Sequence, residues 1–239
     1  MTDNKKRIEE LTKELQDHNY NYYVLDNSII SDFEFDTLLK ELQGLEEKYP
    51  DLASENSPTK RVGGEVTKKF VQVKHKYPML SLSNSYSKED IIDFETRIKK
   101  LTNDDIEYVC ELKYDGVAIG IQYINGLFHR AVTRGDGTKG ENVSTNVKTI
   151  KTIPLKLRED FPQDFEIRGE IFFPLKNFER LNKKREENDE PLYANPRNTA
   201  SGTLKSLDSS IAAERGLDCF LYGIYGDNIE IDNHYELVK

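Results

Sequence analysis

The chain is poor in cysteine, in long apolar runs and in positive charge, and each shortage excludes a class of protein. The two cysteines, Cys110 and Cys219, make no disulfide framework and show no metal-ligand spacing, which favours a reducing cytosol. No apolar run approaches the roughly 20 residues that cross a bilayer. The start, MTDNKKRIEEL, lacks the apolar core of a signal peptide. We therefore expect a cytoplasmic protein with no membrane partner.

The charge balance limits the possible partners further. A net charge of −9 over 239 residues argues against a self-sufficient nucleic-acid binder, which usually presents a basic face. A local basic groove is still compatible with an acidic total. With 36% hydrophobic and 32% charged residues, the chain is typical of a globular protein with a heavily charged surface, built as one large domain or two small ones.

Two helices are predicted at the N-terminus. Ile8, Leu11 and Leu15 recur at the spacing of one helix face. Ser31 and Glu34 form the S-x-x-E pattern of a capping box, in which each side chain satisfies an orphan backbone N–H at a helix start. The second helix then carries one apolar stripe, made of Phe35, Leu38, Leu39, Leu42 and Leu45.

A change of pattern separates these helices from the rest of the chain. The second helix ends at Tyr49-Pro50, and residues 51–65 are rich in Ser, Pro and Gly, which predicts a linker or an extended crossing segment. We place a domain boundary near residue 68. A third helix is predicted from a cap at Ser87 to about Leu101. Its inward-facing residues are Ile91, Phe94, Ile98 and Leu101.

Strand patterns dominate the second part of the chain. VAIGIQYI and LFHRAVTR are joined by Asn125-Gly126, whose residues tolerate the positive φ of a type I′ hairpin turn. FEIRGEIFF alternates with period two, KNFERLNKKREEN predicts a charged helix, and LDCFLYGIYG predicts a last strand. The predicted fold class is α+β. A helical subdomain, residues 1–68, precedes a domain of antiparallel sheets with flanking helices, residues 69–239.

A glycine cluster follows the hairpin and suggests a dinucleotide site. Gly135, Gly137 and Gly140 have the G-x-G-x-x-G spacing, which binds dinucleotides when it links a buried parallel strand to a helix. Here the cluster follows the second strand of an antiparallel hairpin. The next stretch, NVSTNVKTIKTIPL, is rich in β-branched residues, so we expect no helix there. We reject a Rossmann site and expect a flexible turn.

The stretch CELKYDG holds the first candidate for chemistry. On an extended strand Glu111, Lys113 and Asp115 would project from one face. A solvated charged face is the ordinary explanation. The alternative is a nucleophilic Lys113, which requires a neutral amine, supplied by desolvation or by nearby cations. Arg134 is such a cation, because the hairpin spacing brings it to the same end of the sheet. By itself K-x-D-G is too common to support a function.

Three further stretches change that balance. A row of charges falls on one face of EIRGEIFF: Glu166, Arg168 and Glu170. Buried charges need partners, so this face is either wet or lines a site. Arg197 and Lys205 lie in ANPRNTASGTLKSLD, which predicts a loop of small residues suited to close approach by an anion. Tyr222 lies on the last strand, where its ring could stack on a base.

In this order the stretches resemble the nucleotidyltransferase core of the bacterial NAD-dependent DNA ligases. The matching stretches are HKYPMLSLSN, CELKYDG, TRGDGTKGENVSTNV, EIRGEIFF and NPRNTASGTLKSLD. YNYYVLDNSIISDFEFD resembles the helical nicotinamide-reading subdomain, which ATP-dependent ligases and capping enzymes lack. The resemblance implies an ATP-grasp-like ligase core in a monomeric N-terminal fragment, truncated before the OB, zinc and helix-hairpin-helix domains. Most of the grip on nicked double-stranded DNA would lie in those missing domains.

The resemblance also implies a role for individual residues. Lys113 would attack the α-phosphate of NAD, form AMP-lysine and expel nicotinamide mononucleotide, and the AMP would then pass to the 5′-phosphate of a DNA nick. Ser81, Leu82 and Glu111 would contact adenosine, Glu170 its ribose, and Tyr222 its base. Arg134 and Arg197 would lie at the phosphates and the DNA end. Asp115, in the same motif as Lys113, would lie in the nucleotide site. The mononucleotide half would be held by Tyr22, Tyr23, Asp32 and Asp36. Mg²⁺ would share charge neutralisation, with no protein ligand assigned.

Two positions depart from the family pattern. Phe35 stands where the family usually has tyrosine, and Lys205 where many members have arginine, so a hydroxyl and a bidentate geometry are lost. Two alternatives stay open. An ATP-dependent nucleotidyltransferase would share Lys113 and Asp115, although the N-terminal aromatic and acidic cluster argues against it. A non-catalytic nucleotide-binding or partner-docking module is the other.

Overall fold

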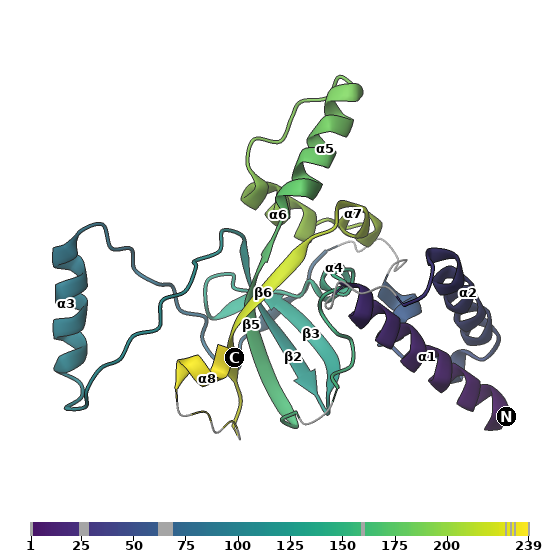
Figure 1. Ribbon diagram of the computed structural model, residues 1–239, viewed down its shortest axis with the longest axis horizontal. Coiled ribbons are helices and arrows are strands. Elements are labelled where there is room, and N and C mark those ends of the chain that lie inside the picture. The colour runs from purple at the N-terminus through teal and green to yellow at the C-terminus, as the bar shows by residue number, and fades with distance from the viewer. Residues whose placement is uncertain are drawn as a thin grey trace.

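A computed structural model describes residues 2–23, 29–61, 69–158, 161–227, 229, 231 and 233–238. Its N-terminal part is a helix pair, α1 (Thr2–Tyr23) and α2 (Asp32–Lys48), as predicted (Figure 1). The capping box at α2 is formed, because Ser31 Oγ accepts from the Glu34 N–H at 3.3 Å and the Glu34 carboxylate accepts from the Ser31 N–H at 2.9 Å. The buried core of the pair is Ile8, Leu11, Leu15 and Leu42.

The segment after α2 is more ordered than the predicted linker. It contains two short 3-10 helices, η1 (Pro50–Leu52) and η2 (Pro58–Arg61). Ser54 and Ser57 accept backbone N–H bonds from residues two positions on, and such local bonds give turns their shape. Ser57 is fully buried. The predicted boundary near residue 68 lies outside the described residues.

A four-stranded antiparallel sheet forms the centre of the second part. Its strands, in the order β3-β2-β5-β6, are β2 (Val117–Ile124), β3 (Leu127–Thr133), β5 (Asp164–Phe172) and β6 (Asp218–Tyr225). The predicted hairpin turn is confirmed, with φ of 50° at Asn125 and 73° at Gly126. A small second sheet pairs β1 (Gln72–Lys74) with β4 (Lys139–Glu141). The antiparallel α+β class is confirmed.

The two faces of the central sheet differ in chemistry. Directly paired residues share a face, and Ile119 with Ile121 on β2 and Ile171 on β5 form a core face with no exposure. The opposite face pairs Ala118 with Glu170 and Gly120 with Arg168. Small residues therefore stand beside charged ones on this polar face.

Short helices cover the core face, and two of them correct the predictions. They are α4 (Ser144–Val147), α6 (Pro196–Leu204) and α7 (Ser209–Arg215). α4 lies where no helix was expected, because burying Val147 outweighs the poor helix propensity of the β-branched stretch. α6 replaces the predicted loop. Asn195 caps it by accepting from the Asn198 N–H, Pro196 begins it, and its small residues fit against the core.

The charged helix is present as α5 (Leu175–Glu187), and α8 (His234–Val238) follows the last strand. Arg158 and Lys148 connect the second part of the chain to the N-terminal part. Arg158 bonds Asp17 at 2.5 Å and stacks on Tyr20, and Lys148 Nζ donates to the Glu55 carbonyl at 2.9 Å. Among the described residues, no helix is long and apolar enough to cross a membrane.

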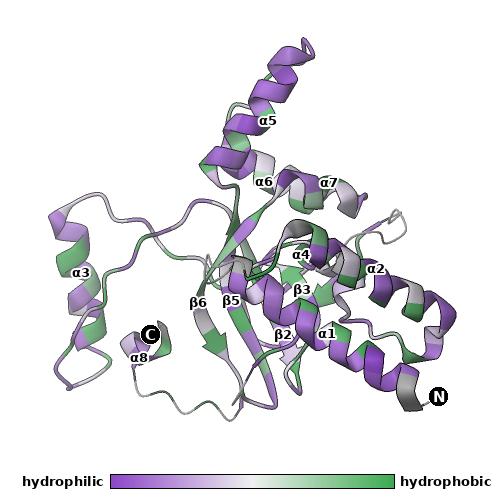
Figure 2. Cartoon of the chain, turned by 45° about the vertical axis from the view of Figure 1, so that its right-hand side comes forward, coloured by the Kyte–Doolittle hydropathy of each residue, from purple (hydrophilic) through white to green (hydrophobic). Residues whose placement is uncertain are grey.

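The third predicted helix, α3 (Lys88–Lys99), has the expected cap but not the expected burial. Ser87 and Asp90 form a capping box. However, Ile91 is 55%, Phe94 44% and Leu101 87% exposed, so the inward orientation was wrong. α3 lies in the middle of residues 80–113, here called the arm, and stands apart from the sheet (Figures 1 and 2). Apolar spacing specifies which helix face is apolar, and it does not specify what covers that face.

Candidate functional site

Glu170 lies on the polar face, near the end of β5, and is half-buried. Burial raises the pKa of its carboxyl above the ordinary value. Four neighbours act in the opposite direction: Lys113, the Gly116 N–H, Arg197 and Arg134. These groups come from three separate segments, so the fold gathers three predicted site cations around one predicted site carboxylate.

Lys113 reaches this place without being part of a strand. Residues 111–115 precede β2 and form no ladder, so the prediction of a strand face shared by these side chains was wrong. The reason is that both neighbouring strands end too early: β3 ends at Thr133, opposite Ile119, and β5 ends at Phe172, one residue past the Val117–Ile171 pair. Gly116 packs directly against β5. A Cβ added to this glycine would lie 2.1 Å from the Ile171 carbonyl oxygen. Glycine is therefore required beside the lysine by close backbone approach.

The other two predicted carboxylates of this segment are paired. Asp115 lies 3.1 Å from Arg197 Nη1, at the first turn of α6. Glu111 lies 2.9 Å from His234 Nε2 of α8. Asp115 therefore joins the cluster around Glu170 through Arg197, whereas Glu111 faces the C-terminal helix.

The glycine cluster forms the expected turn, which is closed by hydrogen bonds. Gly135 and Gly137 have positive φ, at 57° and 91°. Asp136 accepts bonds from the Lys139 and Thr138 N–H groups and the Thr138 hydroxyl at 2.7–2.9 Å. The Lys139 N–H is the largest cause of a fall in the pKa of Asp136 to about 2. A carboxylate bound in this way holds the loop on which Arg134 is carried.

Arg134 links this loop to two further predicted residues. Its backbone N–H donates to the Ala118 carbonyl at 3.2 Å, which places it at the Lys113 end of the sheet, as predicted. Its Nη1 donates to Ser81 Oγ at 3.3 Å. Leu82, beside Ser81, is exposed. Lys205 ends α6 and pairs with Glu141 of β4 at 2.6 Å, so it lies beside the loop and away from Glu170.

Tyr222 also lies near Glu170. It lies on the edge strand β6 and is 36% exposed. Burial, and then the neighbouring Glu170 carboxylate, raise the pKa of its hydroxyl. A half-exposed ring beside a half-buried carboxylate provides an apolar surface next to a hydrogen-bond acceptor.

The N-terminal candidates lie away from this cluster. Asp36 is exposed on α2, and Asp32 begins that helix one turn earlier. Phe35 packs on the core of the helix pair. The side chains of Tyr22, Tyr23 and Asp32 lie outside the described residues. α2 and the arm lie at opposite ends of the molecule in two views (Figures 1 and 2).

Some residues of the site were missed in the sequence. The role of Asp136 was signalled by the D-x-T spacing of a side-chain-closed turn. His75, whose Nε2 bonds the Arg134 carbonyl at 3.1 Å, had no such signal because the contact joins distant segments. Within the described part of the chain, no group of three or more His, Cys, Asp or Glu could hold a metal ion.

Comparisons with known proteins identify the family of this chain. A family model described as NAD-dependent DNA ligase adenylation domain matches residues 67–239, and one described as DNA ligase-like, N-terminal NAD⁺-binding domain matches residues 1–63. The class is thus that of an adenylation domain behind an NAD⁺-binding one. The chain belongs to the NAD-dependent DNA ligase family, which confirms the predicted resemblance.

The curated relatives are longer than this chain. The DNA ligase of Bacteroides fragilis is 56% identical over 233 residues, which are 97% of this chain and 35% of that protein. The DNA ligases of Christiangramia forsetii and Flavobacterium psychrophilum are 56% and 55% identical, with the same 97% and 35% coverage. The chain therefore spans about a third of the length of these curated relatives.

Proposed function

We propose that this chain accepts AMP from NAD on Lys113, as the first step in sealing a DNA nick. The observation that carries the proposal is the convergence of Lys113, Arg134 and Arg197 around Glu170. Phosphoryl transfer depends on positioning and on cations that absorb charge on the phosphate oxygens. The site offers both, beside an exposed lysine.

The proposed reaction is an in-line displacement. The neutral Lys113 Nζ attacks the α-phosphorus of NAD, a P–N bond forms, and the amine proton is lost to solvent. The bond from phosphorus to the bridging oxygen breaks, and nicotinamide mononucleotide leaves with that oxygen. Arg134 and Arg197 stabilise the developing charge. AMP is later displaced from the lysine by the 5′-phosphate of the nick.

The remaining site residues hold the nucleotide in this proposal. Glu170 accepts from a ribose hydroxyl, Tyr222 stacks on adenine, and Ser81 and Leu82 line the adenosine side. Because Glu170 and Asp115 both lie beside cations, Mg²⁺ would be held here through phosphate oxygens and water, which suits its reluctance to dehydrate. Tyr22, Tyr23, Asp32 and Asp36 hold the mononucleotide half, which requires the helix pair to approach the sheet.

Labelled dinucleotide tests the proposal directly. The chain is incubated with NAD, or separately with ATP, labelled at the α-phosphate, and the adduct is located by peptide mapping. The same assay is run on a chimera that continues with the remaining sequence of the Bacteroides fragilis ligase. We expect label from NAD on Lys113, none in Lys113→Ala, and full label in Lys100→Ala, an exposed lysine on the arm.

Other outcomes favour the alternatives. Label from ATP alone indicates an ATP-dependent nucleotidyltransferase, and label from neither nucleotide in either protein indicates a non-catalytic module. Label on another lysine contradicts the role of Lys113.

The N-terminal half of the proposal has its own test. Asp36→Ala, made in the chimera, should cripple adenylation by NAD and spare sealing of a nick that already carries AMP on its 5′-phosphate. The alternative is that Asp32 and Asp36 only complement the helix dipole, worth about 0.3–1 kcal/mol of stability. A variant that reacts normally with NAD, or that loses both steps equally, contradicts a nicotinamide-reading helix.

A further inference from the structure

Arg168 is a buried cation that the proposed chemistry does not use. It is 5% exposed, and its Nε donates to Glu166 Oε1 at 2.9 Å. Its neighbours on both adjacent strands are glycines, Gly120 on β2 and Gly223 on β6. Without side chains on either side, the guanidinium fits over the sheet, 3.9 Å from the centre of the Tyr225 ring.

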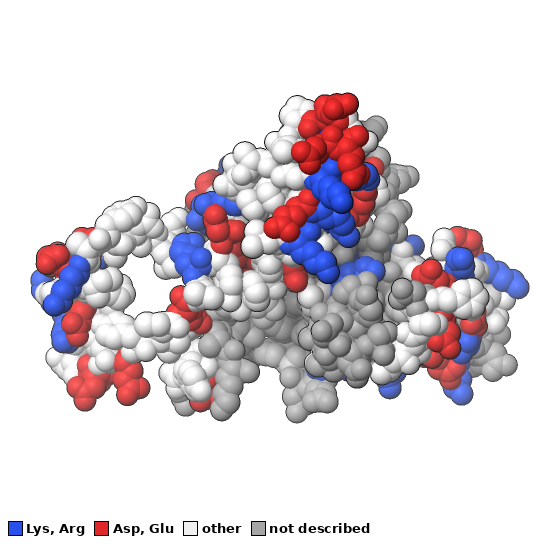
Figure 3. Space-filling model, turned by 45° about the horizontal axis from the view of Figure 1, so that its top comes forward, with Lys and Arg blue, Asp and Glu red and all other residues white. Residues whose placement is uncertain are grey.

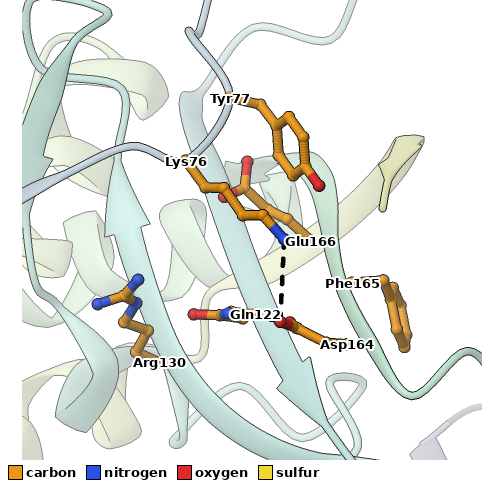
Figure 4. A pocket seen from close by; sticks show the side chains of 7 residues that line it. All are labelled: Lys76, Tyr77, Gln122, Arg130, Asp164, Phe165 and Glu166. Carbon is orange, nitrogen blue, oxygen red and sulfur yellow. Dashed lines mark hydrogen bonds and ion pairs between the residues drawn. The ribbon is translucent and has the colours of Figure 1, made fainter. Parts of the chain in front are cut away.

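Its other donors hold a crossing segment of backbone. Nη2 donates to the Tyr77 carbonyl at 2.7 Å and Nη1 to the Pro78 carbonyl at 3.0 Å. Both carbonyls belong to residues 75–79, here called the strap, which crosses the polar face of the sheet. Figure 4 shows Lys76 and Tyr77 of the strap above Gln122, Asp164 and Glu166.

The strap is fixed at its two edges as well. At one edge, His75 and Met79 donate backbone N–H bonds to the carbonyls of Thr138 and Gly137, both at 2.9 Å. At the other, Lys76 Nζ and the Tyr77 hydroxyl reach Asp227 at 3.0 and 2.9 Å. Arg168 holds the middle of the strap, between these two edges.

The contacts that hold the strap end at Met79, immediately before the residues that would line the site. Met79 is 4% exposed, whereas Leu80, the next residue, is 85% exposed. Ser81 then meets Arg134 at 3.3 Å. The course of residues 80–82 is therefore set at one end by the strap and at the other by the loop that carries Arg134.

We propose that Arg168 is a positioning residue: by holding the carbonyls of Tyr77 and Pro78, it fixes the segment that lines the adenosine side of the site. The inference rests on the proposed function. Two separate carbonyls and a carboxylate require several donors in one rigid plane. Guanidinium supplies this geometry and the ammonium group of lysine does not. Arg168→Lys therefore keeps the charge beside Glu166 and loses the double tie.

Binding of AMP to this chain, measured by calorimetry, tests the role. Arg168→Lys should weaken AMP binding about tenfold or more through loss of hydrogen bonds to backbone, and should speed amide exchange at Met79. Arg215→Lys is the matched control, because Arg215 is also partly buried and donates to Thr203 Oγ1 and the Tyr193 hydroxyl at 2.8 and 2.9 Å, outside the strap. It should keep AMP affinity even if its thermal midpoint falls equally.

AMP affinity of Arg168→Lys within about twofold of the unaltered chain, or an equal loss in both variants, overturns the positioning role. If Arg168→Lys does not fold, Tyr225→Leu removes the stacking partner and keeps the buried charge pair. Tyr225→Leu should weaken AMP binding less than is expected of Arg168→Lys, and should also speed amide exchange at Met79. Faster exchange at Met79 with normal AMP affinity overturns the inference. Failure of the unaltered chain to bind AMP overturns the proposed function as well, whereas normal binding in every variant overturns the positioning role alone.

Discussion

The strap and the arm are consecutive in the chain, yet they are held in opposite ways. Residues 75–79 are tied to the sheet by backbone, guanidinium and carboxylate contacts. Residues 80–113 leave the sheet, and Figure 3 shows open space between α3 and the body. Lys113 lies where the arm returns to Gly116. The candidate nucleophile is therefore carried by an exposed segment, whereas Glu170 and Tyr222, which would hold the ribose and the base, are carried by strands β5 and β6.

The largest expected effect separates the core beneath the site from the arm. Ile119→Ala should lower the free energy of unfolding by about 2–5 kcal/mol, because it empties a fully buried position. Phe94→Ala on α3 should change it by less than about 0.5 kcal/mol, because Phe94 is 44% exposed and lies outside the buried core. Urea unfolding of both variants measures the difference. Equal losses would show that the arm is packed in solution.

The next effect concerns the point where the arm meets the sheet. Gly116→Ala should cost about 1–3 kcal/mol, because its Cβ would overlap the Ile171 carbonyl. Gly202→Ala is the control, since nothing lies within 4 Å of its added Cβ, and alanine should stabilise α6 by up to about 1 kcal/mol. Thermal melts would distinguish them, and a harmless Gly116→Ala would mean that the arm can shift away from β5.

A smaller effect depends on pH and on the loop that carries Arg134. The pKa of Asp136 is lowered to about 2, so its contribution to stability is present above the ordinary pKa of aspartate and is lost as pH falls through about 2. Asp136→Asn should therefore be less stable than the unaltered chain at pH 6, with the gap narrowing between about pH 4 and pH 2. Asp105→Asn on the arm should show no such gap. If Asp136→Asn is less stable by the same amount at every pH, the charge of Asp136 is not what stabilises the loop.

The smallest effect is expected at Glu170, where burial and neighbouring cations oppose each other. The pKa of Glu170 is raised in the folded protein, so the ionised carboxylate lowers stability at pH values above the folded pKa. This loss of stability disappears at low pH, where the carboxyl is protonated. Glu170→Gln should slightly raise the thermal midpoint at pH 7 and leave it unchanged near pH 3.5, while Glu107→Gln on the arm changes neither. A lower midpoint at pH 7 would mean that the cations outweigh burial.

Local signals in the sequence were enough for much of the fold. The capping boxes at Ser31 and Ser87, the turn at Asn125-Gly126 and the alternation in β5 each depend on residues a few positions apart, so their physics is contained in short stretches. The motif order also predicted the family, and with it Lys113, Arg134, Arg197 and Glu170 as one group. The structure brings the three cations near Glu170, and the role of each residue stays a prediction.

Only the tertiary structure decided where the non-local partners lie. The α6 segment is helical because its small residues pack on the core. Residues 111–115 form no strand because they extend past the ends of both strands that flank β2. The same holds for Arg168, whose charge pattern was visible but whose partners, Tyr77 and Pro78, lie about ninety positions away. Contacts over such separations depend on how the chain closes on itself, and no periodicity within a strand or helix encodes them.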